Sequence, residues 1–324
     1  MEKIIKLKKL LNNFNLDGYI VPKNDEFFGE YIHESKDKLK FISDFSGSYG
    51  FALILKNKNY LFVDGRYVEQ AKIQAGKKFK ILEIPKKLPY QILRPSLNLG
   101  FDPMVFTSRS LLYYFRNKVK LTPIPNSILN SNISKDQTSK KFYLLNPKIV
   151  GETVNSKIKR LIQILKKDGS DHIFISAPEN VAWLLNIRGR DNPFSPIPNC
   201  RIILNTKGEV SFFSDIKNSS NIFKKKDFLR TSFFKDSQIE NFLNKLNVKK
   251  IIIDKNSCSV LLENLISSKF KISKIGDPLY LMKSIKNKVE INKTMESHVH
   301  DGVAVTKFLY WIKKNQNKKI SEID

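Results

Sequence analysis

Cysteine is scarce in this chain, and long apolar runs are missing from it. Cys200 and Cys258 are the two cysteines among 324 residues, too few for a disulfide framework or a cysteine-rich zinc site. No apolar run approaches the ~18 residues that a membrane-spanning helix needs. The N-terminal stretch also lacks the apolar region and cleavage site of a signal peptide. The sequence therefore predicts a soluble, cytoplasmic protein with no membrane partner.

Acidic residues are outnumbered by basic ones. The chain contains 31 Asp and Glu against 57 Lys and Arg, which gives a formal net charge of +26. Nucleic-acid-binding proteins often share this excess, but they gather basic and aromatic residues on one face. Here the lysines are spread along the whole chain, and runs such as Lys224–Lys226 fall in expected turns. We predict no specific nucleic-acid partner, and we interpret the charge as background composition that attracts polyanions weakly.

The composition is that of a folded protein. Hydrophobic residues make up 41% of the chain and charged residues 27%, which is enough to form buried cores. A length of 324 residues suits two domains with part of a third.

The first segment alternates between helical and extended patterns. Ile4, Leu7 and Leu11 recur at a spacing typical of a helix with one apolar face. The runs 51–55 and 60–63 flank a polar tetrad, which predicts a β-hairpin. Helices are predicted over 4–14, 68–75 and 108–115, and strands over 19–21, 51–55, 60–63, 79–84 and 97–101.

The layout then repeats in a second segment. A polar stretch without periodicity over 126–141 predicts an interdomain linker. A second hairpin joins 200–204 to 210–213 and echoes the first. Helices are predicted over 153–167, 178–185, 239–246 and 260–267, and strands over 172–176, 200–204, 210–213, 251–254 and 270–275. The predicted fold class is α/β, with a duplication of structure but no repeat at the level of residues.

The last segment predicts one long helix over 285–314. Its apolar side chains recur at helical spacing: Met295, Val299, Val303, Val305, Leu309 and Ile312. Such a face needs a larger body to pack on, and within this chain the two preceding domains are the surfaces available. His298 and Asp301 share a face of this helix. We expect them to have a surface or packing role, because partners for a metal site do not accompany them.

Several stretches of the chain carry a family resemblance. They are 21–26 with 29–31 (VPKNDE, GEY), 41–50 (FISDFSGSYG), 62–67 (FVDGRY), 100–103 (GFDP), 182–189 (AWLLNIRG) with Asp191, 285–290 (IKNKVE) and 298–304 (HVHDGVA). Each stretch alone is a modest signal, but they follow in family order from end to end. In these motifs the chain resembles the Xaa-Pro aminopeptidase (aminopeptidase P) family, within the creatinase/pita-bread group.

The resemblance implies two creatinase-N-terminal-like α/β domains with mixed sheets, followed by the first helix of a truncated pita-bread α+β domain. In that division, residues 1–128 are domain I, 129–144 a linker, 145–284 domain II and 285–324 the start of the catalytic domain. Members of the family use two divalent metals, usually Mn²⁺, to release the residue that precedes proline in a peptide. The resemblance also implies a homodimer.

The resemblance places the metal ligands outside this chain. The family uses two Asp, one His and two Glu from the catalytic domain, and none of those motifs occurs within 1–324. We therefore expect no catalytic or metal-binding residue here, and we interpret the chain as an N-terminal fragment that is inactive alone. The alternative is a non-catalytic binding or oligomerisation module of the creatinase N-terminal type.

Arg66 is the candidate for substrate binding. In the resembling family, the arginine of DGRY reaches the substrate side of the active site. The planar fork of an arginine can hold a carboxylate or a peptide carbonyl. The other interpretation is an ion pair within the domain, with Asp64 or Glu69.

Five further residues are candidates for a groove or an interface. Arg188, Arg190 and Asp191 lie in a polar loop that either lines an interface or is held in shape by its own hydrogen bonds. Trp183 is expected to pack in a core or an interface. His33 belongs either to the substrate groove or to a loop as an ordinary histidine.

Three acids near the N-terminus suggest a paired-carboxylate site. They are Asp25, Glu26 and Glu30, and Lys23 lies beside them. Nothing in the sequence marks them as buried, so we expect them to be loop-forming residues.

Overall fold

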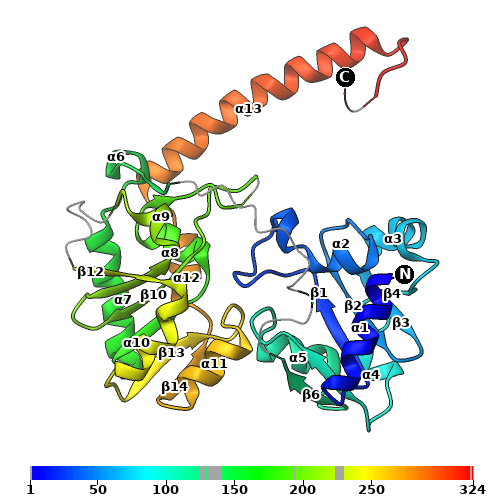
Figure 1. The fold of residues 1–324 in the computed structure, drawn as a ribbon. Helices are drawn as coiled ribbons and strands as arrows, with labels where there is room; N and C mark the ends of the chain where they lie inside the picture. The colour runs from blue at the N-terminus through cyan, green and yellow to red at the C-terminus, as the bar shows by residue number, and fades with distance from the viewer. Residues whose placement is uncertain are drawn as a thin grey trace.

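The computed structural model describes residues 2–124, 129, 141–192, 194–222, 230–321 and 323. Most of the predicted linker, together with Lys224–Lys226, lies outside the described residues. Two α/β units stand side by side in Figure 1, and one long helix leaves the second unit.

The first unit contains α1 (Glu2–Asn13), β1 (Gly18–Pro22), α2 (Lys38–Ser43), β2 (Gly50–Leu55), β3 (Asn59–Asp64), α3 (Val68–Ala75), β4 (Lys80–Ile84), α4 (Pro89–Ile92), β5 (Asn98–Phe101), α5 (Ser108–Phe115) and β6 (Lys120–Pro123). Its strands form a six-stranded sheet in the order β4-β3-β2-β1-β5-β6. β2 is antiparallel to both β1 and β3. The other neighbours are parallel, so the sheet is mixed.

The second unit contains β7 (Tyr143–Leu144), α6 (Pro147–Val150), α7 (Val154–Asp168), β8 (His172–Ile175), α8 (Pro178–Leu184), β9 (Ile187–Arg188), β10 (Cys200–Asn205), β11 (Val210–Ser214), α9 (Ile216–Ser219), β12 (Thr231–Lys235), α10 (Ile239–Lys245), β13 (Lys250–Asp254), α11 (Val260–Ser267), β14 (Lys271–Ile275) and α12 (Pro278–Ser284). Its main sheet has the order β12-β11-β10-β8-β13-β14. β10 is antiparallel to both β8 and β11, and the other neighbours are parallel. The two sheets thus have the same topology, which confirms the predicted α/β fold and the duplication of structure.

Both faces of the first sheet are covered by helices, as the alternation of its side chains requires. Tyr19 and Val21 of β1 belong to the core beneath α1, α2 and α3, whereas Ile20 points into the core beneath α4 and α5. Ile4 and Leu7 of α1 are buried, as their helical spacing predicts.

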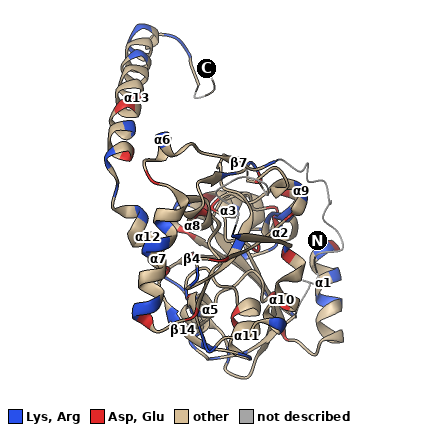
Figure 2. Cartoon of the chain, turned by 90° about the vertical axis from the view of Figure 1, so that its left-hand side faces the viewer, with Lys and Arg blue, Asp and Glu red and all other residues tan. Residues whose placement is uncertain are grey.

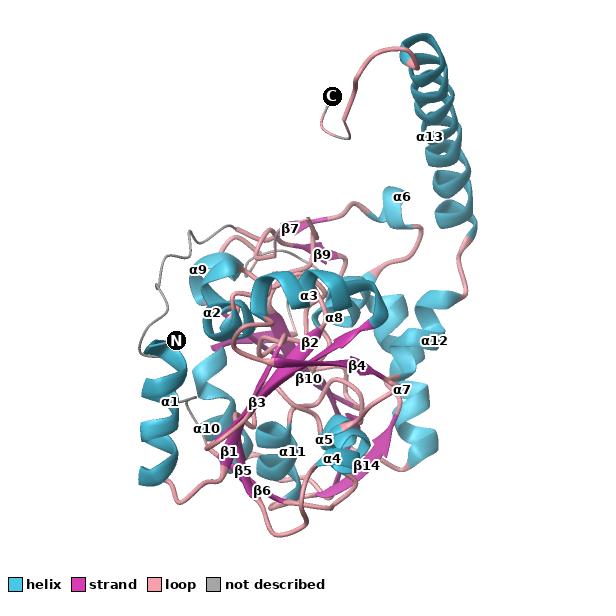
Figure 3. Ribbon diagram, turned by 90° about the vertical axis from the view of Figure 1, so that its right-hand side faces the viewer, coloured by secondary structure: helices cyan, strands magenta, loops and turns pink. Residues whose placement is uncertain are grey.

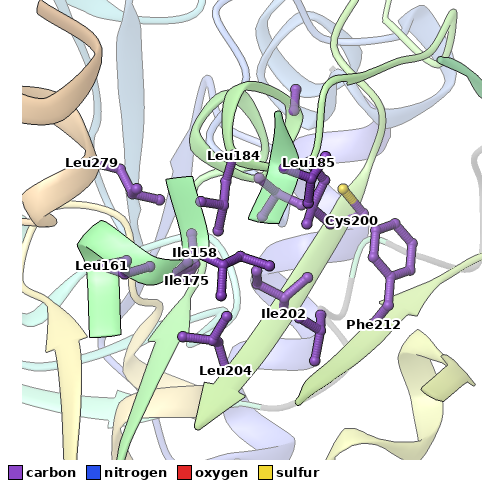
Figure 4. Packing of buried hydrophobic residues seen from close by; sticks show 14 of the residues in the cluster. Ile158, Leu161, Ile175, Leu184, Leu185, Cys200, Ile202, Leu204, Phe212 and Leu279 are labelled. Atoms are coloured by element: carbon purple, nitrogen blue, oxygen red, sulfur yellow. The ribbon is translucent and has the colours of Figure 1, made fainter. Parts of the chain in front are cut away.

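The second sheet is covered in the same way. α7, α8 and α12 lie on one face, and α10 and α11 on the other. Figure 4 shows Ile175, Ile202 and Leu204 from adjacent strands meeting Ile158 and Leu161 of α7. Each unit is therefore a sheet between two layers of helices.

The two units contact each other through the loop between β5 and α5 and the first turn of α11. The backbone amide of Val260 donates to the Phe106 carbonyl at 2.8 Å, and the amide of Leu261 donates to the Pro103 carbonyl at 3.0 Å. The Val260 side chain completes a core of the first unit. These contacts fix the units relative to each other.

The last helix, α13 (Lys288–Asn315), differs from its prediction in one respect. The predicted helix is present, but none of its described residues is buried, and Val299 is 67% exposed. Figures 1 and 3 show α13 leaving both units rather than lying on them. The expectation that the two preceding domains cover its apolar face is therefore wrong. Among the described residues, no helix is long and apolar enough to cross a membrane.

Candidate functional site: a cavity between the two units

A cavity of about 1070 Å³ lies where loops of the two units meet. The first unit contributes the loop between β1 and α2, and the second contributes the loop between β9 and β10 together with the ends of β11 and β12. Its walls are formed by Glu26, Phe27, His33, Lys36, Tyr143, Gly189, Arg190, Asp191, Asn192, Phe194, Ser195, Pro196, Asn199, Ser214, Asp215, Ile216, Lys217, Asn218, Lys235, Asp236 and Ser237. Acids, bases and aromatic rings are all present, so the cavity suits a ligand with charges of both signs.

Arg201 joins the two units beside this cavity. It lies in β10 and is 1% exposed. Its Nη1 pairs with Asp236 Oδ1 at 2.6 Å, and its Nη2 donates to the backbone carbonyl of Glu26 in the other unit. The guanidinium also lies 4.1 Å from the centre of the Phe27 ring, where a cation–π attraction acts. Arg201 thereby links Asp236 of the second unit to the backbone of Glu26 in the first, and both of these residues line the cavity.

The acids near the N-terminus are more structured than the sequence predicts. Asp25 is buried, and its Oδ1 accepts hydrogen bonds from the amides of Phe27 and Gly29 at 3.0 and 3.3 Å. Burial raises the pKa of Asp25, and the neighbouring Glu26 adds to the shift. Glu26 pairs with Lys36. Asp25 thus has the expected loop-forming role, because the loop folds around its carboxylate, but it is buried, which nothing in the sequence marks.

Asp191 organises the opposite wall. Its Oδ2 accepts from the amide of Asn199 at 2.7 Å, and its Oδ1 accepts from Asn218 Nδ2 at 2.9 Å. Burial raises the pKa of Asp191 to about 6. The loop between β9 and β10 is therefore tied to α9 through one partly desolvated carboxylate.

His33 and Arg190 line the same cavity from opposite units. The Nδ1 of His33 contacts Ser35 Oγ at 2.8 Å, which orients the ring at the start of a short helical turn. Tyr31 and Phe194 meet edge to face across the two units, with ring centres 5.7 Å apart. Phe194 is nevertheless 91% exposed, so it presents an apolar surface beside the cavity.

A second cavity of about 530 Å³ lies between the second unit and the first turns of α13. Trp183, Arg188, His298 and Asp301 line it, together with Lys157. Arg188 donates to the carbonyls of Ala182 and Ile187, at 3.2 and 2.8 Å.

Lys157 is the buried cation of this second cavity. Its Nζ donates to the Trp183 carbonyl at 2.8 Å and to Asn186 Oδ1 at 2.7 Å, and it lies 4.2 Å from the centre of the Trp183 ring. Burial lowers the pKa of Lys157 to about 8. Trp183 therefore covers a desolvated amine.

Arg66 lies apart from both cavities. It is exposed, and its Nη2 pairs with Asp64 Oδ2 at 2.6 Å. Hydrogen bonding to Arg66 lowers the pKa of Asp64. The guanidinium also lies 5.2 Å from the centre of the Tyr67 ring. The two interpretations of Arg66 are compatible, because an exposed pair can exchange a partner at little cost.

The structure thus groups the candidate residues in a way that the sequence does not. His33, Arg190 and Asp191 share the first cavity, Trp183 and Arg188 share the second, and Arg66 belongs to neither. Arg201 and Lys157 were not predicted at all. A signal for each exists, because Arg201 interrupts an apolar strand and Lys157 falls on the apolar stripe of α7.

The two-metal centre that the family resemblance implies does not fit the described part of the chain. No group of three or more His, Cys, Asp and Glu side chains there is arranged to hold a metal ion. The charged and polar side chains that line both cavities can offer ion pairs and hydrogen bonds to a ligand.

Comparison with known proteins agrees with this fold. The family model of the creatinase/prolidase N-terminal domain matches residues 3–129, and a second model with the same description matches 134–290. The X-prolyl aminopeptidase of Caenorhabditis elegans, described as a cytosolic enzyme with a di-nuclear active site, superposes with a TM-score of 0.84 at 22% identity. The match covers 97% of this chain and 56% of that one.

Curated relatives match over the same span. A probable Xaa-Pro aminopeptidase P of Laccaria bicolor is 27% identical over 98% of this chain and 52% of its own length. Xaa-Pro aminopeptidase 1 of Dictyostelium discoideum is 28% identical over 99% of this chain and 54% of its own length. The chain thus spans about half the length of the curated relatives it matches.

The fold and the two family matches define a tandem pair of creatinase/prolidase N-terminal domains. The chain belongs to the aminopeptidase P family, which confirms the resemblance seen in its motifs.

Proposed function

We propose that this chain is the N-terminal part of a cytoplasmic, metal-dependent Xaa-Pro aminopeptidase, which releases the residue preceding proline from peptides. The observation that carries the proposal is a match to named Xaa-Pro aminopeptidases along almost the whole chain, which covers about half of each relative. Two divalent ions, Mn²⁺ or similar, would be held by the part of the enzyme that this chain does not span. The chain alone would then supply the oligomerisation and substrate-gating domains and would not hydrolyse peptides.

The same proposal assigns the parts of the chain. Residues 1–128 and 145–284 form the two gating and oligomerisation domains, 129–144 link them, and 285–324 begin the catalytic domain. The enzyme would act as a homodimer. Arg66 would exchange Asp64 for a substrate carboxylate or carbonyl, since the side chain is exposed and its present partner lies only two residues away in sequence.

A chimera tests the activity. Residues 1–324 are joined to the part of the Dictyostelium enzyme that the match leaves uncovered, and release of the residue before proline is measured with and without Mn²⁺. We expect Mn²⁺-dependent release from the chimera and none from 1–324 alone. Activity of 1–324 alone, or a folded chimera that binds Mn²⁺ without activity, would contradict the proposal.

The same chimera tests Arg66. We expect Arg66→Ala to lower kcat/KM by about tenfold, which corresponds to one lost charged hydrogen bond. Arg94→Ala is the matched control, because Arg94 is an exposed arginine of the same unit. Equal effects of the two variants would assign Arg66 to its ion pair only.

A second candidate function is a non-catalytic binding module. The cavity between the units favours it, because its walls supply charges of both signs to a ligand. Calorimetry with an Ala-Pro-Pro tripeptide in the presence of a chelator distinguishes the two candidates. Binding to the isolated chain without metal supports the module, and binding only to the Mn²⁺-loaded chimera supports the aminopeptidase.

A further inference from the structure

One side chain, that of Asn287, both caps the start of α13 and binds a residue of α6. Asn287 caps the helix, because its Oδ1 accepts from the amide of Glu290 at 2.9 Å while Glu290 Oε2 accepts from the amide of Asn287 at 2.9 Å. The Asn287 Nδ2 points the other way and donates to the carbonyl of Val150 at 2.8 Å. The same side-chain amide therefore caps α13 and attaches it to the last residue of α6, from which residues 151–152 continue as a loop.

Glycine at position 151 allows this close approach. Gly151 has a φ of +75°, in the left-handed region that favours glycine. A Cβ at this position would lie 2.2 Å from Asn287 Oδ1 and 2.8 Å from the Cβ of Val289. No other residue type fits between this loop and α13 without moving one of them.

The loop is anchored in turn to the core of the second unit. The carbonyl of Glu152 accepts from Asn186 Nδ2 at 3.0 Å, and Asn186 Oδ1 accepts from the buried Lys157. The Glu152 carboxylate pairs with Arg160 of α7 at 2.6 Å. A continuous path of hydrogen bonds therefore runs from α7 through residues 150–152 to the first turn of α13.

This path matters because α13 has little else to orient it. None of its described residues is buried, and of the helices and strands it contacts α6 most. We propose that Asn287 is a positioning residue that fixes the direction of α13 relative to the second unit, through Val150 and Gly151. The inference concerns the geometry of this chain and does not depend on the proposed aminopeptidase activity.

Asn287→Asp separates helix capping from attachment. Aspartate caps helices about as well as asparagine, because its carboxylate accepts the same amide hydrogen bond. It cannot donate to the Val150 carbonyl, so the attachment is lost while the cap remains. Asn292→Asp is the matched control, because Asn292 is an exposed asparagine one turn further along α13.

The measurement is the distance between two spin labels, placed at Lys166→Cys on α7 and Lys307→Cys on α13. Both sites are exposed, whereas the native Cys200 and Cys258 are buried and escape labelling in the folded chain. We expect one narrow distance distribution for the parent and for Asn292→Asp, and a distribution at least twice as wide for Asn287→Asp. Circular dichroism should show equal helix content in all three.

Two results would overturn the inference. One is an Asn287→Asp distribution as narrow as that of the parent with an unchanged mean. The other is a parent distribution already as wide as that of the variant. Gly151→Ala provides an independent variant, since its Cβ displaces Asn287 without altering that residue, and it should widen the distribution in the same way.

Discussion

At the scale of single residues, Arg201 joins the two units. It is a fully buried cation whose partners, Asp236 and the Glu26 carbonyl, come from different units. Replacing it leaves a carboxylate and a carbonyl without their donor, which costs more than the loss of the pair itself.

We therefore expect Arg201→Met to lower the free energy of unfolding by about 2 to 4 kcal/mol. Arg230→Met is the control, because Arg230 is exposed and surface changes usually stay within about 0.5 kcal/mol. Urea unfolding followed by circular dichroism measures both variants. Equal midpoints for the two would show that Arg201 does not hold the units together.

Asp191 makes stability depend on pH. Its pKa is about 6 in the folded chain against an ordinary value of 3.8. Between these two values the folded chain binds more protons than the unfolded chain, so this group's contribution to stability falls as the pH rises from about 4 to about 6. Above pH 6 the contribution no longer changes.

Asp191→Asn should remove the contribution of Asp191 to the fall in unfolding free energy between pH 4 and pH 6. We expect the decrease in unfolding free energy between pH 4 and pH 6 to be shallower in Asp191→Asn than in the parent, as measured by urea unfolding at half-unit steps. Asp301→Asn, at an exposed position on α13, should keep the parent's slope. A parent slope that persists in Asp191→Asn would assign it to other groups.

At the scale of elements, the end of α7 illustrates how the backbone conformation of a single residue ends a helix. Gly169 ends this helix with a φ of +68°, and a Cβ there would meet nothing within 4 Å. A Cβ at Gly276 would also meet nothing within 4 Å, but that glycine has no positive φ. The two glycines therefore differ in backbone conformation and not in available space.

Gly169→Ala should destabilise the chain by about 1 kcal/mol, the cost of a left-handed conformation for a residue with a Cβ. Gly276→Ala should be neutral or slightly stabilising, because it reduces the freedom of the unfolded chain. Thermal unfolding of the two variants side by side measures the difference. Equal effects would show that backbone strain is not what separates them.

Local sequence patterns, namely apolar runs, helical spacing and breaks at Gly and Pro, explain which elements could be predicted. Strands such as β2 and β10 were predicted as apolar runs beside hairpin turns, and helices with a clear apolar stripe, such as α1 and α7, were predicted from spacing. α12 was missed because Gly276 and Pro278 indicate a break and only a short helix follows. β12 was missed because it is a short strand whose partner β11 lies beyond α9 in sequence.

At the scale of the whole molecule, the cavity could not be predicted from the sequence. His33 and Arg190 are far apart in sequence and line one cavity only because the loop between β5 and α5 docks against the first turn of α11. That docking uses backbone hydrogen bonds at Val260 and Leu261, which carry no sequence signal. The family motifs identified the loops, but the distances between loops depend on the docking.

The net charge of +26 is also a property of the whole molecule. Figure 2 shows Lys and Arg on α1, α7, α12 and α13, on different sides of the body. Such a spread attracts polyanions without selecting among them. We expect equally weak binding of a DNA duplex and of polyglutamate at 50 mM salt, and loss of both at about 200 mM. Preference for DNA that survives the higher salt would reveal a nucleic-acid site.

The exposed length of α13 amplifies small movements at its base. A helix of 28 residues with a rise of about 1.5 Å per residue is about 42 Å long. A rotation of about 10° at Asn287 would therefore displace the far end by about 7 Å, more than the rise of one helical turn, about 5.4 Å. α13 therefore acts as a lever arm. The position of its far end depends on how closely Gly151 fits against the side-chain amide of Asn287.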